Sequence, residues 1–202
     1  MSWIKPWPAD ATERRELENS LLGLRGEKIT EVRYLNPSSS EDSSLGSHPD
    51  LHEVSMGIEL EISRSSLFVV AWQMQGACEG LAFGLFPTTT YERRPRLSSF
   101  DVGSAGPWRT RMGGMISEVG VAWHIPDDAC PPTVWSIRFV LDSGDAVTFS
   151  LGEVDPDGWL RYQPDGILAI FDPDVAKTFR IPASKIPAWG IPLVGGECAD
   201  ET

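Results

Sequence analysis

One stretch decides the fold class of this chain: Ile137-Arg-Phe139-Val-Leu141-Asp-Ser-Gly-Asp145-Ala-Val147-Thr-Phe149-Ser-Leu151. Apolar side chains occupy every second position, first over 137–141 and then over 147–151, which is the pattern of half-buried β-strands. The residues between the two runs, Asp142-Ser-Gly-Asp145, have the composition of a tight hairpin turn. The stretch therefore predicts two antiparallel strands joined by a short turn.

The same signals continue on both sides of this hairpin. Alternating apolar positions recur over 58–62 and 119–123, and continuous apolar runs over 67–72 and 167–171 predict more deeply buried strands. Asp155-Pro-Asp-Gly158 and Pro164-Asp-Gly166 are turn sequences. Because no helical period separates these short strands, we expect a mainly β fold, either an antiparallel two-sheet sandwich or a barrel.

A short helix is predicted near the N-terminus. Asp10 can cap it, and Glu13 follows at the spacing of a capping box. Leu17 and Leu21 then fall on one helical face, and Gly23 is expected near the end of the helix.

Two segments of the chain resemble each other and suggest an imperfect internal duplication. Leu24-Arg-Gly-Glu-Lys-Ile-Thr-Glu-Val32 matches Arg111-Met-Gly-Gly-Met-Ile-Ser-Glu-Val119, and each is followed by an alternating strand and then a second strand. The predicted repeat units are about 24–86 and 111–172, joined by a linker of about 87–110. We expect one β-rich domain over 1–183, with a C-terminal arm and a disordered acidic tail over 184–202.

The charge of the chain limits its partners. The formal net charge is −12, which argues against binding to nucleic acid or to an anionic membrane surface. An acidic surface would instead speed the approach of a basic protein. No apolar run is long enough for a membrane span or a signal peptide, so a cytoplasmic location is expected.

Cys78, Cys130 and Cys198 are odd in number, far apart in sequence and form no CxxC pair. This spacing predicts neither a disulfide framework nor a zinc site and is typical of a reducing compartment.

No motif in the sequence identifies a reaction. Walker A, GxGxxG and GxSxG are all missing. His48, His52 and His124 lack the spacing of familiar zinc sites, so no metal and no cofactor are expected. A nucleophilic pair of Cys130 and His124 is disfavoured because Asp127 and Asp128 would raise the pKa of the thiol.

A basic island interrupts the acidic chain at Arg93-Arg-Pro-Arg96, with Arg109 and Arg111 a little later. Arginine is well shaped to hold an anionic ligand. The alternative, which we favour, is a solvated linker between the two repeats.

Tryptophan supplies the strongest hint of a ligand site, since there are eight in the chain. Either the strand tryptophans are core, or they line an apolar pocket with polar points. The candidate ligand- or partner-binding residues are Trp72, Trp123, His124, Trp135, Trp159, Tyr162, Asp127 and Asp128.

Three functions fit these patterns. The first is an acidic protein-binding module, such as an inhibitor or immunity-type protein, that presents loops 36–53 and 124–132 to a basic partner. The second is a small-molecule enzyme or carrier of the cyclase or isomerase type with an aromatic-lined pocket. The third is a scaffolding subunit that forms a homodimer through its C-terminal arm, with Trp189 and residues 191–194.

Overall fold

The computed structural model describes residues 4–37, 50–62, 65–91, 97–104, 106–179 and 190–193. Predictions for His48, Arg93–Arg96, Trp189, Cys198 and the acidic tail lie outside these residues. In chain order the elements are α1 (Ala11–Leu22), β1 (Ile29–Pro37), β2 (Leu51–Val54), β3 (Gly57–Ile62), β4 (Ser66–Gln75), β5 (Cys78–Pro87), β6 (Leu97–Asp101), the 3-10 helix η1 (Gly106–Trp108), β7 (Ile116–His124), β8 (Thr133–Leu141), β9 (Ala146–Leu151), β10 (Glu153–Val154), β11 (Leu160–Arg161), β12 (Ile167–Ile170), α2 (Pro173–Thr178) and β13 (Ile191–Pro192).

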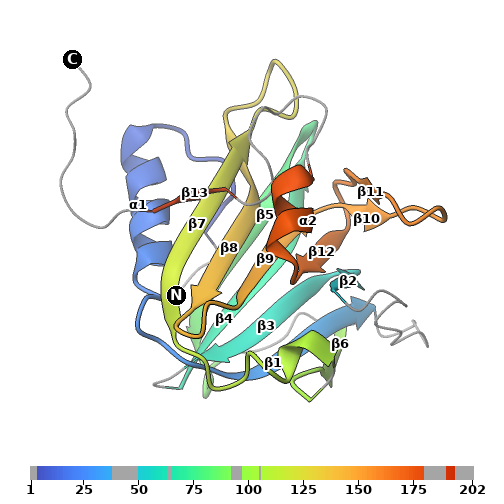
Figure 1. The fold of residues 1–202 in the computed structure, drawn as a ribbon. Coiled ribbons are helices and arrows are strands. Elements are labelled where there is room, and N and C mark those ends of the chain that lie inside the picture. The colour runs from blue at the N-terminus through green and yellow to red at the C-terminus, as the bar shows by residue number, and fades with distance from the viewer. Residues whose placement is uncertain are drawn as a thin grey trace.

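Two antiparallel sheets form the body of the protein (Figure 1). The five-stranded sheet has the order β5-β4-β3-β1-β6, and the six-stranded sheet has the order β13-β7-β8-β9-β12-β2. The sheets pack face to face, and the rings of Phe68 on β4 and Phe139 on β8 meet at 5.4 Å. The predicted sandwich is therefore confirmed, and the sheets do not join into one closed sheet.

The hairpin predicted from 137–151 is present as β8 and β9, with Phe139 paired to Val147. Its apolar side chains are buried between the sheets, as the alternation predicts. The polar side chains of Ser136, Thr148 and Ser150 are buried as well, although the pattern predicted an outer face in water. Part of the reason is α2, which packs against β9.

Helix α1 forms as predicted. The Asp10 carboxylate accepts hydrogen bonds from the amides of Thr12 and Glu13, and the Glu13 carboxylate accepts one from the amide of Ala9 at 2.8 Å. Leu17 and Leu21 are buried in the core of the sandwich. No helix in the described ranges is long and apolar enough to span a membrane.

Three short strands arise where the sequence predicted loops or a linker. β2 lies at the end of the predicted loop 36–53 and pairs with β12. β6 lies in the predicted linker and pairs with β1, and β13 lies in the predicted arm and pairs with β7. Each of these strands is short and depends on a partner that is distant in sequence, so local pattern carries little signal for it.

Candidate functional site

The hairpin of β10 and β11 presents Trp159 to solvent. Its side chain is 73% exposed, which makes it the most exposed large apolar side chain in the described part of the chain. A side chain of this size is normally at least half buried in a folded domain. Its exposure on a formed hairpin marks this position as a candidate contact for another molecule.

Asp155 holds the tip of this hairpin in one conformation. Its Oδ1 accepts hydrogen bonds from the amides of Asp157 at 3.0 Å and Trp159 at 2.8 Å. Its Oδ2 lies 2.7 Å from Nε of Arg161. The hydrogen bond from the Trp159 amide is the main reason that the pKa of Asp155 is lowered. Gly158 completes the turn with φ +86°, which favours glycine.

A shallow acidic groove of about 320 Å³ lies at the base of the same hairpin. It is lined by Glu53, Val54, Ser55, Gly152, Glu153, Gln163, Asp165, Gly166 and Ile167. The three carboxylate side chains in this set belong to exposed residues. Glu53 also accepts a hydrogen bond from the amide of Val154 at 2.7 Å, which joins β2 to the hairpin. The exposed tryptophan and the acidic groove thus belong to one surface, which we call the hairpin surface.

Just after β11, Tyr162 enters a buried polar cluster. Its hydroxyl donates a hydrogen bond to Oε1 of Glu79 on β5, and its ring lies 5.7 Å from the ring of His124 at the end of β7. His124 is also 6.3 Å from the ring of Trp135. The structure therefore brings together three of the predicted site residues, His124, Trp135 and Tyr162. Glu79 was not predicted, and nothing in its local sequence pointed to it.

Burial sets the protonation of this cluster. The pKa of His124 is lowered to about 4 by burial, an effect that the backbone of Glu79 partly opposes. Burial, and then the neighbouring Glu79, raises the pKa of Tyr162. Near pH 7 the imidazole is therefore neutral and the phenol keeps its proton. His124 is only 5% exposed, so no substrate can reach it in this conformation.

A disulfide bond contradicts the prediction made from the cysteines. Cys78 at the start of β5 is bonded to Cys130, although the two are far apart in sequence. Spacing along the chain could not reveal this, because the two sheets bring the cysteines together. The bond holds residues 125–132, on which Asp127 and Asp128 are exposed.

The remaining predicted tryptophans lie in separate surroundings. Trp72 on β4 is half buried and donates a hydrogen bond to the carbonyl of Ser55 at 2.8 Å. Trp123 is buried, and the guanidinium of Arg14 lies 4.5 Å from the centre of its ring. The predicted set is thus distributed over several places.

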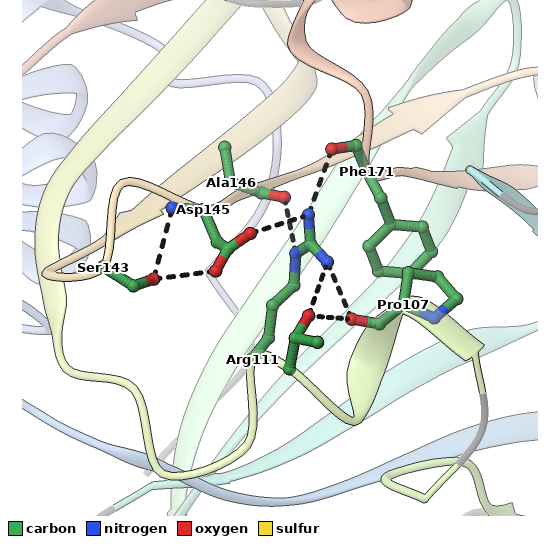
Figure 2. A network of polar contacts seen from close by, with 7 residues as sticks. Pro107, Arg111, Ser143, Asp145, Ala146 and Phe171 are labelled. Carbon is green, nitrogen blue, oxygen red and sulfur yellow. Dashed lines mark hydrogen bonds and ion pairs between the residues drawn. The ribbon is translucent and has the colours of Figure 1, made fainter.

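Arg111 belongs to a second buried network, shown in Figure 2. Its guanidinium donates hydrogen bonds to the carbonyl oxygens of Ala146 at 2.9 Å, Pro107 at 2.7 Å and Phe171 at 3.2 Å. It also pairs with Asp145 at 3.6 Å. The prediction that this arginine is solvated is wrong, because three backbone carbonyls replace the water around its guanidinium.

A buried chain of hydrogen bonds lies close to Arg111. Trp108 donates to the hydroxyl oxygen of Tyr34 at 2.6 Å, and that hydroxyl lies 2.8 Å from Nδ1 of His52. Since Tyr34 accepts from Trp108, its own proton is directed at His52 Nδ1. Burial lowers the pKa of His52 to about 4. These side chains are structural and face the interior.

Among the described residues, no three His, Cys, Asp or Glu side chains are placed to hold a metal ion. No protein-family model, curated protein or solved structure matches this chain.

Proposed function

We propose that this chain is a binding module for a basic protein partner and that the hairpin surface is its contact. The observation that carries the proposal is the exposed Trp159, held on a turn that Asp155 organises. Tryptophan is enriched among the residues that dominate binding energy. A side chain displayed on an ordered turn also loses less conformational entropy when it is bound.

The charge around Trp159 supports a basic partner. Glu53, Glu153 and Asp165 line the groove below it, and the exposed Asp157 stands beside it. Arg161, the basic residue of the hairpin, is paired with Asp155. The net charge of −12 acts in the same direction at longer range. A lysine or arginine of the partner could stack on the indole and face these carboxylates.

The small-molecule alternative has less support. It required several tryptophans around an open pocket with His124. Trp135 is fully buried, and Trp123 lies beneath Arg14. The homodimer alternative used residues 191–194, yet β13 already pairs with β7 of the same chain. A cytoplasmic location stays a prediction, now without the support that unpaired cysteines would give it.

Peptide arrays and quantitative capture from native lysate test the proposed function together. We expect lysine- and arginine-rich peptides to bind and acidic peptides not to bind. Trp159→Ala should weaken binding at least tenfold, since truncating a dominant contact commonly has that effect. Met74→Ala is the matched control, because Met74 is 45% exposed but lies on β4. Unchanged binding by the Trp159 variant, or a preference for acidic peptides, would reject the proposal.

We also propose that the two sheets arose from one duplicated unit. β1-β3-β4-β5 and β7-β8-β9-β12 are both antiparallel meanders in chain order. The pairing of β1 with β3 shifts register after Ile29, and the pairing of β7 with β8 shifts register after the matching Ile116. A shared bulge at matching positions supports the repeat more strongly than the shared strand order alone.

A further inference from the structure

A cleft of about 570 Å³ lies between residues 4–9 and one face of α1, and we call it the N-terminal cleft. Its volume is within the range of small-molecule sites. Apolar and charged side chains from both the segment and the helix line it. In Figure 1, α1 and the hairpin of β10 and β11 lie on opposite sides of the view, so the N-terminal cleft is separate from the hairpin surface.

The segment that forms one wall of the cleft is fixed to both sheets. The amide of Ile4 donates a hydrogen bond to the carbonyl of Phe83 on β5 at 2.7 Å, and the amide of Val134 on β8 donates one to the carbonyl of Pro6 at 2.9 Å. A Cβ built at Gly80 would lie 2.6 Å from Cβ of Pro6, so glycine permits this close approach. The wall is therefore formed before any ligand arrives, which lowers the entropic cost of binding.

Helix α1 forms the opposite wall. The amide of Ala9 donates a hydrogen bond to Oε2 of Glu13 at 2.8 Å, which joins the end of the segment to the first turn of the helix. Leu17 is buried and gives the cleft an apolar surface. The hydroxyl of Ser20 donates to the carbonyl of Glu16 at 2.8 Å, and its oxygen can still accept a hydrogen bond from a ligand.

Trp7 lines the cleft and lies outside the core of the sandwich. Among the described residues, Ile4 packs against that core and Trp7 does not. The Trp7 side chain is half buried, on a segment that the two sheets hold in place. A large aromatic ring on a fixed backbone offers apolar contact area at a low cost in conformational entropy. This ring points to a ligand that carries an apolar side chain.

The cleft also contains charges of both signs that do not neutralise each other. Lys5, Glu13 and Glu16 all line it. In the part of the chain that the structure describes, no ion pair joins the lysine to either glutamate, and the side-chain charges of Lys5 and Glu16 have no partner. A ligand with one ammonium and one carboxylate group complements this arrangement.

We propose that the N-terminal cleft binds a zwitterionic dipeptide with apolar side chains. Its ammonium group pairs with Glu16, its carboxylate pairs with Lys5, and its side chains pack on Trp7 and Leu17. Two residues of extended chain span about 7 Å, which separates the two end charges as the cleft separates its own. A dipeptide also fills more of the cleft than a single amino acid does. This site does not depend on the proposed basic partner.

Isothermal titration calorimetry of the whole protein with three forms of one dipeptide tests the proposal. The probes are leucyl-phenylalanine, its N-acetyl form, which lacks the ammonium group, and its C-terminal amide, which lacks the carboxylate. We expect the free dipeptide to bind most tightly. Each blocked form should bind at least threefold more weakly, because each loses one pair of charges at a solvent-accessible site.

Two charge variants connect each preference to one side chain. Glu16→Gln should remove the difference between the free and the N-acetyl dipeptide, and Lys5→Gln should remove the difference between the free dipeptide and its amide. Glu18→Gln is the matched control, because it makes the same charge change on α1 at a residue that does not line the cleft. It should keep both differences.

Trp7→Ala should weaken binding of the free dipeptide at least tenfold, with thermal unfolding recorded to show that the variant is folded. If this variant does not fold, the glutamine variants decide the question, since Lys5 and Glu16 are exposed. Three outcomes would overturn the proposal: no heat of binding from the free dipeptide, equal affinity for all three probes, or unchanged affinity in a folded Trp7→Ala protein.

Discussion

The backbone amide of Gly26 donates a hydrogen bond to the carbonyl of Ile116 at 2.8 Å, and the amide of Gly113 donates one to the carbonyl of Ile29 at 2.8 Å. The two glycines occupy the third position of the matching segments of the proposed repeat units. Both have positive φ, +85° at Gly26 and +79° at Gly113. The segments therefore cross each other with reciprocal bonds, which places a local twofold relation between the two sheets.

Replacing either glycine by alanine should destabilise the protein by a similar amount. A side chain at positive φ costs about 1–2 kcal/mol. Nothing lies within 4 Å of a Cβ built at Gly26 or Gly113, so backbone strain is the main effect. Urea denaturation would measure it. Gly23→Ala is the control, because Gly23 has a right-handed helical conformation and the change should stay within about 0.5 kcal/mol. Clearly unequal losses at Gly26 and Gly113 would argue against equivalent roles.

Arg111→Lys should cost about 2 kcal/mol in the free energy of unfolding. One ammonium group cannot direct hydrogen bonds to the carbonyls of Ala146, Pro107 and Phe171 together, as the planar guanidinium does. Thermal and urea unfolding would measure the loss. Arg109→Lys is the matched control, since Arg109 is exposed and should tolerate the change. If both variants unfold like the parent protein, the Arg111 network contributes little to stability.

Stability should fall as the pH is lowered from about 6.5 to about 4. Burial depresses the pKa of both His52 and His124 to about 4, so the unfolded chain binds more protons in this range. Each histidine can contribute up to about 3 kcal/mol above pH 6.5, and this contribution is lost as protonation drives unfolding. His124→Gln should flatten the slope of unfolding free energy against pH, whereas an unchanged slope would mean that His124 is not buried as a neutral ring.

Asp155→Ala should loosen the hairpin tip while leaving the core intact. The variant loses the hydrogen bonds to the amides of Asp157 and Trp159 and the pair with Arg161. Amide hydrogen exchange at 155–159 should become faster, and binding through Trp159 should weaken. Asp157→Ala is the control, because its side chain is exposed and Asp157 bonds to Asp155 through its backbone amide. If amide hydrogen exchange is equally fast in both variants, Asp155 does not organise the turn.

Local sequence predicted what depends on nearby residues. The alternation over 137–151 predicted the hairpin of β8 and β9, and Asp10 with Glu13 predicted the start of α1. These signals are reliable because a strand face and a helix cap are made by residues a few positions apart. The turn at Asp155 was predicted for the same reason, although the exposure of Trp159 was not.

Features formed by residues that are far apart in sequence could not be predicted without the tertiary structure. The alternation predicts that Thr148 and Ser150 face water, yet both are buried. By sequence Arg111 belongs to a solvated basic island, yet three backbone carbonyls bind its guanidinium. Tyr162 and Glu79 meet across the two halves of the chain, and no spacing rule connects them.

By itself, the sequence determined a mainly β chain with an N-terminal helix, tight Asp-Gly turns and a strongly acidic balance. Side-chain periodicity and helix capping depend on residues a few positions apart, and the net charge is a sum over the composition. The sequence alone is therefore sufficient for these properties. Only the tertiary structure decided that Cys78 bonds to Cys130, that β2, β6 and β13 cover strand edges, and that Trp159 is exposed. Each depends on how two sheets pack, and packing brings together residues that the linear order keeps apart.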